Sequence, residues 1–186
     1  MSNLKQHLGG HNNVTHIDRG ALRWAVEQFD VKSFLDIGCG PGGMVKHAES
    51  IGLEALGIDG DNTVKRYDNS KFHIHDYTVS EYKPDKIYDL GWSCEFVEHV
   101  HEQYIPNFMP CFQACKTVIM TYAPPGFPGH HHVNCQTEDY WIAVFSQYGF
   151  VYSAEYTEQL RMFSTMNTDK EKSKQFVKNT GLVFVN

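Results

Sequence analysis

The sequence contains no long apolar run. No stretch approaches the ~20 consecutive apolar residues that a membrane-spanning helix needs. The first 20 residues are polar and rich in histidine, and they lack the apolar core of a secretory signal peptide. We therefore expect a cytoplasmic protein without a membrane partner.

Basic residues are also few. Lysine and arginine number 16 against 22 acidic residues, and the formal net charge is −6. A protein that grips double-stranded nucleic acid usually carries a basic face, so such a substrate is disfavoured, whereas a short strand or a nucleotide end stays open. The lysine-rich stretch at positions 170, 172, 174 and 178 is interrupted by Asp169 and Glu171, and we interpret it as the solvated face of a helix.

Cysteine is scarce and irregularly spaced. The five cysteines are odd in number and form no C-x-x-C pair. A disulfide framework is therefore not expected, and reduced thiols in a reducing compartment fit the pattern best. The cysteines are Cys39, Cys94, Cys111, Cys115 and Cys135.

Short apolar runs alternate with helical patterns along the chain, without repeats or low-complexity linkers. This alternation predicts an α/β fold with a parallel sheet, and 186 residues suffice for one such domain. We expect helices at 42–51 and 137–148, the latter capped by Thr137, and a helix through Phe29 capped by Thr15 or Asp18. Strands are expected at residues 33–38, 55–59, 72–75, 87–93, 117–122, 150–154 and 182–185.

A glycine-rich turn follows the first predicted strand. Gly38, Gly40 and Gly42 form a G-x-G-x-G pattern between an apolar strand and a helix. Glycine suits this place because the chain must turn sharply and let a ligand approach the backbone. The third glycine comes one residue earlier than in dinucleotide-binding turns. The carboxylate of Asp36 suits a ligand with an ammonium group and would repel a pyrophosphate.

The segment from Asp36 to Gly42 resembles motif I of the class I S-adenosylmethionine-dependent methyltransferases. Asp59 ends the second strand, where that family places the acidic residue that binds the ribose hydroxyls, and Asp76 and Tyr77 follow the third strand, where it places residues against the adenine. Residues 88–93 look like its fourth-strand motif. The resemblance implies a cofactor site made of Asp36, Gly38, Cys39, Gly40, Gly42, Asp59, Gly60, Asp76, Tyr77 and Ser93.

The resemblance also implies a complete fold. We expect a Rossmann-like α/β domain over residues 31–186, with seven mostly parallel strands and helices on both faces. Residues 1–30 form an N-terminal segment and the first helix. Residues 7–16 are expected to fold across the cofactor as a lid hinged at Gly9 and Gly10, with plain disorder as the alternative.

An E-x-x-E-H pattern follows the fourth strand. In a helix, Glu95, Glu98 and His99 would share one face, and two carboxylates with one imidazole form a partial site for a divalent cation. A second histidine cluster, at positions 130–132, follows the fifth strand. In open α/β sheets both places lie at the ligand-binding edge.

This pattern is similar to two metal-assisted branches of the family, the ubiquinone-pathway O-methyltransferases and the small-RNA 3′-terminal 2′-O-methyltransferases. The resemblance implies Mg, Mn, Zn or Fe held by Glu95, Glu98, His99 and His132, with His131 as the alternative to His132. Glu98, His99 and His131 would carry the catalysis, with His130 or His101 as other proton acceptors. In the alternative interpretation, these residues only cap and pair at a helix start without a metal.

Three functions follow from these patterns. The favoured one is methyl transfer from S-adenosylmethionine to a hydroxyl of a small molecule, because the chain is acidic and compact. The second is 2′-O-methylation of the terminal ribose of a nucleic acid, and the third is a cofactor-binding protein without catalysis. Methylation of an amine is left open, although the N-P-P-Y tetrapeptide is absent. The patterns carry no information on the oligomeric state.

Overall fold

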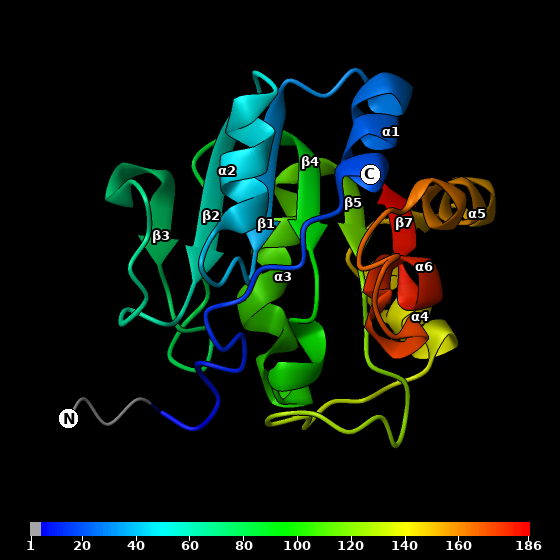
Figure 1. Cartoon of the computed structure of the whole chain (residues 1–186). Helices are drawn as coiled ribbons and strands as arrows, with labels where there is room; N and C mark the ends of the chain where they lie inside the picture. The colour runs from blue at the N-terminus through cyan, green and yellow to red at the C-terminus, as the bar shows by residue number, and fades with distance from the viewer. Residues whose placement is uncertain (1–4) are drawn as a thin grey trace.

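Within residues 5–186, which the computed structural model describes, the strands form one sheet in the order β3-β2-β1-β4-β5-β7-β6 (Figure 1). Strands β1 to β5 run parallel, and β7 runs antiparallel to both β5 and β6. This confirms the predicted Rossmann-like, mostly parallel sheet. The strands are β1 (Ser33–Ile37), β2 (Glu54–Asp59), β3 (Phe72–Ile74), β4 (Tyr88–Ser93), β5 (Cys115–Met120), β6 (Val151–Tyr152) and β7 (Leu182–Val185).

Helices join the strands and cover both faces of the sheet. They are α1 (Arg19–Phe29), α2 (Gly43–Ser50), α3 (Ile105–Gln113), α4 (Glu138–Gln147), α5 (Ala154–Phe163) and α6 (Phe176–Thr180). Short 3₁₀ turns occur as η1 (Asn69–Lys71), η2 (Val97–His99), η3 (Glu102–Tyr104) and η4 (Lys172–Lys174). None of the helices in the described part of the chain is long and apolar enough to cross a membrane.

The core lies in two layers, one on each face of the sheet. Residues that alternate along a strand point to opposite faces, so Leu35 and Phe34 of β1 enter different layers. One layer receives the apolar sides of α3 and α4, including Phe108 and Phe145. The other receives α1, α2 and α5, including Leu22, Ala25, Met44, Val45 and Leu160. Strand residues are therefore held rigidly, and only their carboxyl ends are free to meet a ligand.

Two predicted capping residues act as caps. Asp18 accepts the Ala21 N–H at 2.9 Å and begins α1, which decides between the two predicted candidates. Thr137 accepts the Tyr140 N–H at 3.3 Å and begins α4. The hydroxyl of Thr15 accepts the N–H of Gly43 at 3.1 Å instead, so it ties the N-terminal segment to the first turn of α2.

Three local expectations were wrong. Residues 170–178 do not form one helix, because η4 ends at Lys174 and α6 begins only at Phe176. Strand β6 stops at Tyr152, since the Ser153 side chain accepts the Tyr156 N–H at 3.2 Å and starts α5. Residues 95–99 are not α-helical: Glu95 has a φ of 55°, and only the short turn η2 follows it.

Candidate functional site

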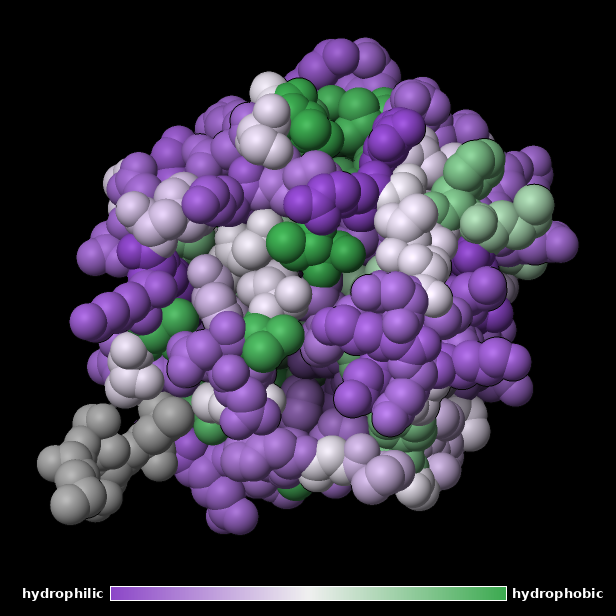
Figure 2. Space-filling model, in the orientation of Figure 1, coloured by the Kyte–Doolittle hydropathy of each residue, from purple (hydrophilic) through white to green (hydrophobic). Residues whose placement is uncertain are grey.

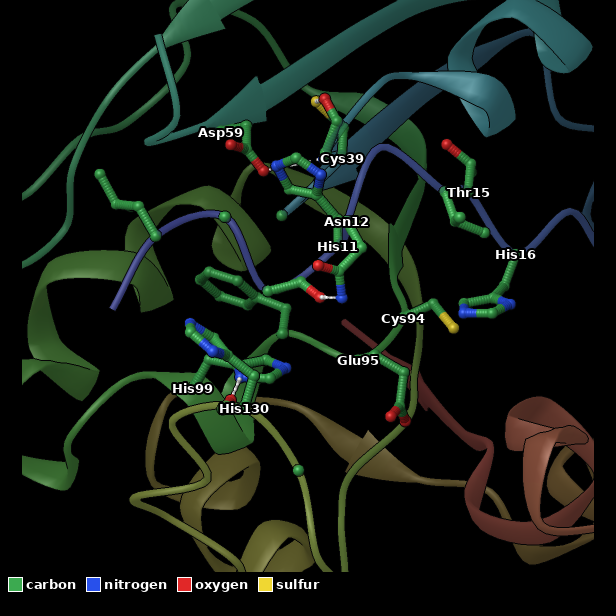
Figure 3. A pocket seen from close by; sticks show the side chains of 18 of the residues that line it. His11, Asn12, Thr15, His16, Cys39, Asp59, Cys94, Glu95, His99 and His130 are labelled. Atoms are coloured by element: carbon green, nitrogen blue, oxygen red, sulfur yellow. Dashed lines mark hydrogen bonds between the residues drawn. The ribbon is translucent and has the colours of Figure 1, made fainter. Parts of the chain in front are cut away.

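A cavity of about 810 Å³ lies at the carboxyl ends of β1, β2 and β4 (Figure 3). This volume falls within the roughly 300–1,000 Å³ of sites for small molecules and cofactors. The N-terminal segment, dark blue in Figure 1, crosses this end of the sheet. The surface in the same orientation is mostly hydrophilic, with scattered apolar residues (Figure 2). Eleven of the sequence-predicted site residues line the cavity: Asp36, Gly38, Cys39, Gly40, Asp59, Gly60, Asp76, Tyr77, Glu95, His99 and His132.

The glycine turn forms one wall of the cavity. Gly38 and Cys39 donate their N–H groups to the carbonyl oxygen of Ile58 at 2.9 and 3.0 Å, which joins the turn to β2. Gly38 has a φ of 78°, and a Cβ there would lie 2.5 Å from the ring of Phe96. Glycine is therefore required at this position by both conformation and space.

Two acidic residues stand beside this turn. Asp36 is only 3% exposed at the end of β1, and burial, then the charge of Asp59, raise the pKa of Asp36 well above its ordinary value. Asp59 accepts the N–H groups of Gly40 and Asp61, each at 2.8 Å. Each carboxylate oxygen of Asp59 keeps a further lone pair for a hydroxyl donor.

Arg66 is a site residue that sequence reasoning missed. Its Nε donates to the Gly40 carbonyl and its Nη1 to the Asp61 carbonyl, both at 3.1 Å, and its Nη2 lies 3.5 Å from Asp59. The side chain is 2% exposed. Arg66 thus locks the glycine turn onto the end of β2. No local pattern identifies it, because its partners are distant in sequence.

Asp76 and Tyr77 line the cavity just beyond the end of β3. Asp76 accepts hydrogen bonds from the Lys5 ammonium at 2.8 Å and from the Thr78 hydroxyl and N–H at 2.7 and 3.0 Å, and it lies 3.0 Å from the His7 ring. Burial raises the pKa of Asp76, but these hydrogen bonds outweigh it, and the pKa lies below the usual range. The hydroxyl of Tyr77 lies 3.1 Å from the Cys111 thiol, so only the ring of Tyr77 faces the cavity.

Phe96 is a second residue that the sequence did not single out. Its ring lines the cavity between the glycine turn and Tyr77, with a centroid separation of 5.7 Å from the Tyr77 ring. The ring also contacts Phe108 of the core at 5.5 Å. An aromatic residue inside an E-x-x-E-H pattern is easily interpreted as a core residue. Here the Phe96 ring packs on the core and also lines the cavity.

Four predicted site residues do not line the cavity. The Ser93 hydroxyl donates to the Ile37 carbonyl at 2.9 Å, and Gly42 packs against the Phe72 ring, so both shape the sheet edge rather than the cavity wall. Glu98 is fully buried behind the wall. His131 points toward His101 and His7, with ring separations of 5.6 and 6.2 Å.

Glu98 belongs to a group of three side chains that could hold a metal ion, and it is the one member of that group that is fully buried. Its ligand atom and those of His99 and His132 all lie within 4.8 Å of one another. Neither carboxylate oxygen of Glu98 has a hydrogen-bond partner among residues 5–186. The backbone carbonyl of Glu98 accepts the N–H groups of Val133 and Asn134 at 2.9 and 3.1 Å, which brings the loop after β5 to the end of β4. Three of the four residues that the sequence predicted as metal ligands are thus brought together, and the metal itself stays a prediction.

Glu95 lies beside Glu98 but contributes no atom to this set. The left-handed backbone at Glu95 breaks the helical face that the sequence predicted, and its carboxylate accepts from the Thr121 hydroxyl at 3.4 Å. Burial raises the pKa of Glu95 to about 7. Burial, and then the charge of Glu95, raise the pKa of Glu98 well above its ordinary value.

Both imidazoles of the set have a defined tautomer. His99 donates from Nδ1 to the His130 carbonyl at 2.8 Å, and His132 donates from Nδ1 to the Phe127 carbonyl at 3.0 Å. Since a carbonyl only accepts, Nδ1 carries the proton and Nε2 keeps a lone pair. Burial, and then the charge of His132, lower the pKa of His99 to about 4, so the ring is neutral at pH 7.

The N-terminal segment packs directly on the cofactor-side wall. Residues 7–12 and 14–16 line the cavity. A Cβ on Gly40 would meet the His11 side chain at 3.2 Å, and one on Gly60 would meet Leu8 at 2.7 Å. Figure 3 shows His11 beside Asp59 and Cys39, and the His11 ring lies 3.1 Å from Asp61.

The profile of a protein family described as a methyltransferase domain matches residues 11–155. The chain belongs to this family. The resemblance to class I S-adenosylmethionine-dependent methyltransferases is thereby confirmed, and S-adenosylmethionine is the cofactor of this class. No curated protein sequence matches the methyltransferase.

Solved structures share the fold of this methyltransferase. The methyltransferase domain of bacterial CtHen1-CN is 16% identical at a TM-score of 0.56, over 90% of this chain and 96% of that one. A TehB-like S-adenosylmethionine-dependent methyltransferase from Corynebacterium glutamicum is 16% identical at 0.63, over 90% and 87%. Magnesium protoporphyrin IX methyltransferase from Synechocystis, with bound S-adenosylhomocysteine, is 17% identical at 0.56, over 71% and 70%. At such identities the likeness establishes the fold alone.

Proposed function

We propose that this methyltransferase transfers the methyl group of S-adenosylmethionine to a hydroxyl of a small molecule, and that a divalent cation assists the transfer. The observation that carries the proposal is the buried Glu98 carboxylate, which lacks a partner among residues 5–186 and faces two imidazoles. Burying a carboxylate without a partner costs free energy. A divalent cation can bind both a carboxylate and the two Nε2 lone pairs, so it would serve as that partner.

The cofactor would lie along the glycine turn. Asp59 would accept the ribose hydroxyls, with Gly60 beside it, and Asp76, Tyr77 and Phe96 would surround the adenine. The methionine part would face Asp36 and the backbone of residues 38–40. Arg66 would act as a positioning residue, because it holds the turn and Asp59 in one arrangement. These assignments agree with the chemistry of each group: Asp59 accepts hydrogen bonds from hydroxyls, and the carboxylate of Asp36 suits an ammonium.

The ligand set fits a cation that accepts nitrogen and oxygen donors. Glu98, His99 and His132 would hold Mn, Fe or Zn, which accept imidazole, more readily than Mg, which prefers oxygen ligands. Glu95 shortly precedes Glu98 and His99 in the chain, and its carboxylate belongs to the cavity wall. Such a cation, when bound, would lower the pKa of an acceptor hydroxyl.

The chain's own groups would complete the reaction. The acceptor oxygen would attack the methyl carbon, the carbon–sulfur bond would break with its electron pair on sulfur, and the hydroxyl proton would pass to a nearby base. Because His130 lines the cavity and His131 does not, we assign the proton to His130 in place of His131. His99 would hold the cation rather than take the proton, since its pKa is low.

Binding and activity measurements test this proposal separately. Calorimetry with S-adenosylhomocysteine reports the cofactor site, and transfer of labelled methyl to catechols, other diols and nucleic-acid ends reports the acceptor. Glu98→Ala should abolish transfer and spare cofactor binding, whereas the exposed Glu81→Ala should change neither. Full activity of Glu98→Ala, or after exhaustive chelation, rejects the metal. Cofactor binding without transfer to any acceptor identifies a non-catalytic protein.

A further inference from the structure

Two lysines stand on the cavity wall near His16. Lys170, Ser173 and Lys174, from the segment between α5 and α6, line the cavity next to His16. Within residues 5–186, Lys170 and Lys174 are the only lysine or arginine side chains in that lining. The carboxylates of the lining belong to Asp36, Asp59, Asp76 and Glu95. The cavity therefore has acidic walls and one cationic side.

The lysine segment is held in place by one asparagine. Asn167 takes a left-handed backbone, with a φ of 52°, and its side-chain amide donates to the Lys174 carbonyl at 2.6 Å. The Lys170 N–H donates to the Asn167 carbonyl at 2.9 Å. The same amide nitrogen lies 3.1 Å from Nδ1 of His16. These bonds hold the backbone of both lysines beside His16. The lysine side chains are exposed, as the sequence predicted, but they do not lie on the face of one helix.

The positive charge of this side is little compensated. Lys174 lies 3.6 Å from Glu171, but both side chains are more than half exposed, and such pairs bind weakly. Lys170 has no ion pair in the part of the chain that the structure describes. Burial, and then the charges of Lys170 and Lys174, lower the pKa of His16. The hydrogen bond from Asn167 raises it, but by less. Both ammonium groups thus act on the same side of the cavity.

We propose that Lys170 and Lys174, with the Ser173 hydroxyl, form a subsite for an anionic group of the methyl acceptor, a phosphate or a carboxylate. The proposal rests on the proposed function. In Figure 3, His16 lies across the cavity from Asp59 and on the side of Cys94 and Glu95. An anion at the lysines would thus hold an acceptor on the Glu95 side of the cavity, away from Asp59. Lysine suits this task as a mobile point charge for oxyanions.

The carboxylate of the cofactor's methionine part is another anion that these lysines could bind. In that case it would occupy the lysines whenever S-adenosylhomocysteine is bound. 5′-Methylthioadenosine lacks that carboxylate and would leave them free. The two sources are therefore separable with inorganic phosphate as the probe in protein saturated with either nucleoside.

The experiment follows phosphate binding by nuclear magnetic resonance of the His16 ring, assigned by its loss in His16→Gln. The double variant Lys170→Ala/Lys174→Ala is compared with Lys172→Ala/Lys178→Ala, which removes the same charge from positions outside the lining. In protein saturated with S-adenosylhomocysteine, phosphate should shift the His16 signal in wild type and control. The dissociation constant should rise roughly tenfold in the first variant, as expected for lost charge-assisted contacts.

Two results overturn the proposal. Equal phosphate binding by both double variants shows that the lysines form no subsite. If S-adenosylhomocysteine abolishes phosphate binding and 5′-methylthioadenosine preserves it, the lysines bind the carboxylate of the cofactor and not the acceptor. If wild type binds neither nucleoside, the proposed function fails, while the phosphate titration without nucleoside still reports on the lysines. Melting temperatures of all variants verify folding.

Discussion

His99 donates a hydrogen bond from Nδ1 to the backbone carbonyl oxygen of His130, and the two atoms are 2.8 Å apart. The His130 ring in turn lies 2.9 Å from the carbonyl oxygen of Gln6. The end of β4, the loop after β5 and the N-terminal segment therefore meet at one residue. A change in either loop would alter both the candidate cation ligands and the cover of the cavity.

Gly129 tests the geometry of the histidine loop. A Cβ at position 129 would lie 2.0 Å from Nε2 of His132, so Gly129→Ala must displace that ring. We expect loss of Mn²⁺ or Zn²⁺ binding and of methyl transfer, with calorimetric affinity for S-adenosylhomocysteine unchanged. Pro125→Ala, at an exposed position in the same loop, is the control and should bind the cation normally. Retained cation binding by Gly129→Ala would exclude His132 as a ligand.

The buried glutamates predict an unusual dependence of stability on pH. Because burial raises the pKa of Glu95 to about 7 and that of Glu98 in the same direction, the folded protein keeps protons that the unfolded chain releases. Stability of the metal-free protein should therefore fall as the pH rises from about 4.3, the ordinary glutamate value, toward neutrality.

Glu98→Gln isolates this effect, because glutamine cannot ionise. Its melting temperature between pH 5 and pH 8, with a chelator present, should fall less than that of wild type. The expected difference is at least ~2–4 °C, the shift that about 1 kcal/mol produces in a domain of this size. Added Zn²⁺ should stabilise wild type and not the variant. Parallel melting curves for the two proteins would remove Glu98 from this account.

Asp59 tests the assignment of the ribose side. Asp59→Ala removes the acceptor of the Gly40 and Asp61 N–H groups as well as the acceptor proposed for the ribose. Calorimetry should show affinity for S-adenosylhomocysteine weaker by ~1–3 kcal/mol, the cost of a lost charge-assisted hydrogen-bond site. The exposed Asp85→Ala is the control. Unchanged affinity in Asp59→Ala would place the ribose elsewhere.

The N-terminal segment should respond to the cofactor. His11 and Leu8 pack on the glycine turn and on Gly60, yet the segment is tied down by a few polar contacts. Hydrogen exchange of the amides of residues 9–12 should slow when S-adenosylhomocysteine binds, because the segment would then close on an additional surface. The amide of Gly52, in the turn before β2, serves as the reference. Identical exchange with and without the nucleoside would speak against a lid.

Most of the sheet was predictable from sequence, but two helices were not. Helix α3 contains Pro110 in its interior, which masks the helical pattern. Helix α5 buries only Thr157 and Leu160, too narrow an apolar stripe to recognise. In both helices, tertiary packing stabilises a helical conformation that the local sequence favours only weakly.

The glycine turn and the acidic strand ends, Asp36, Asp59 and Asp76, were decided by the sequence alone, because parallel strands bring their carboxyl ends to one edge whatever the loops do. The loops were decided by the tertiary structure. Glu98 joins His132, and Lys170 reaches the cavity, through hydrogen bonds between segments far apart in the chain. Hydrophobic periodicity and turn residues report on a few neighbouring residues, so they carry no information about contacts between distant segments.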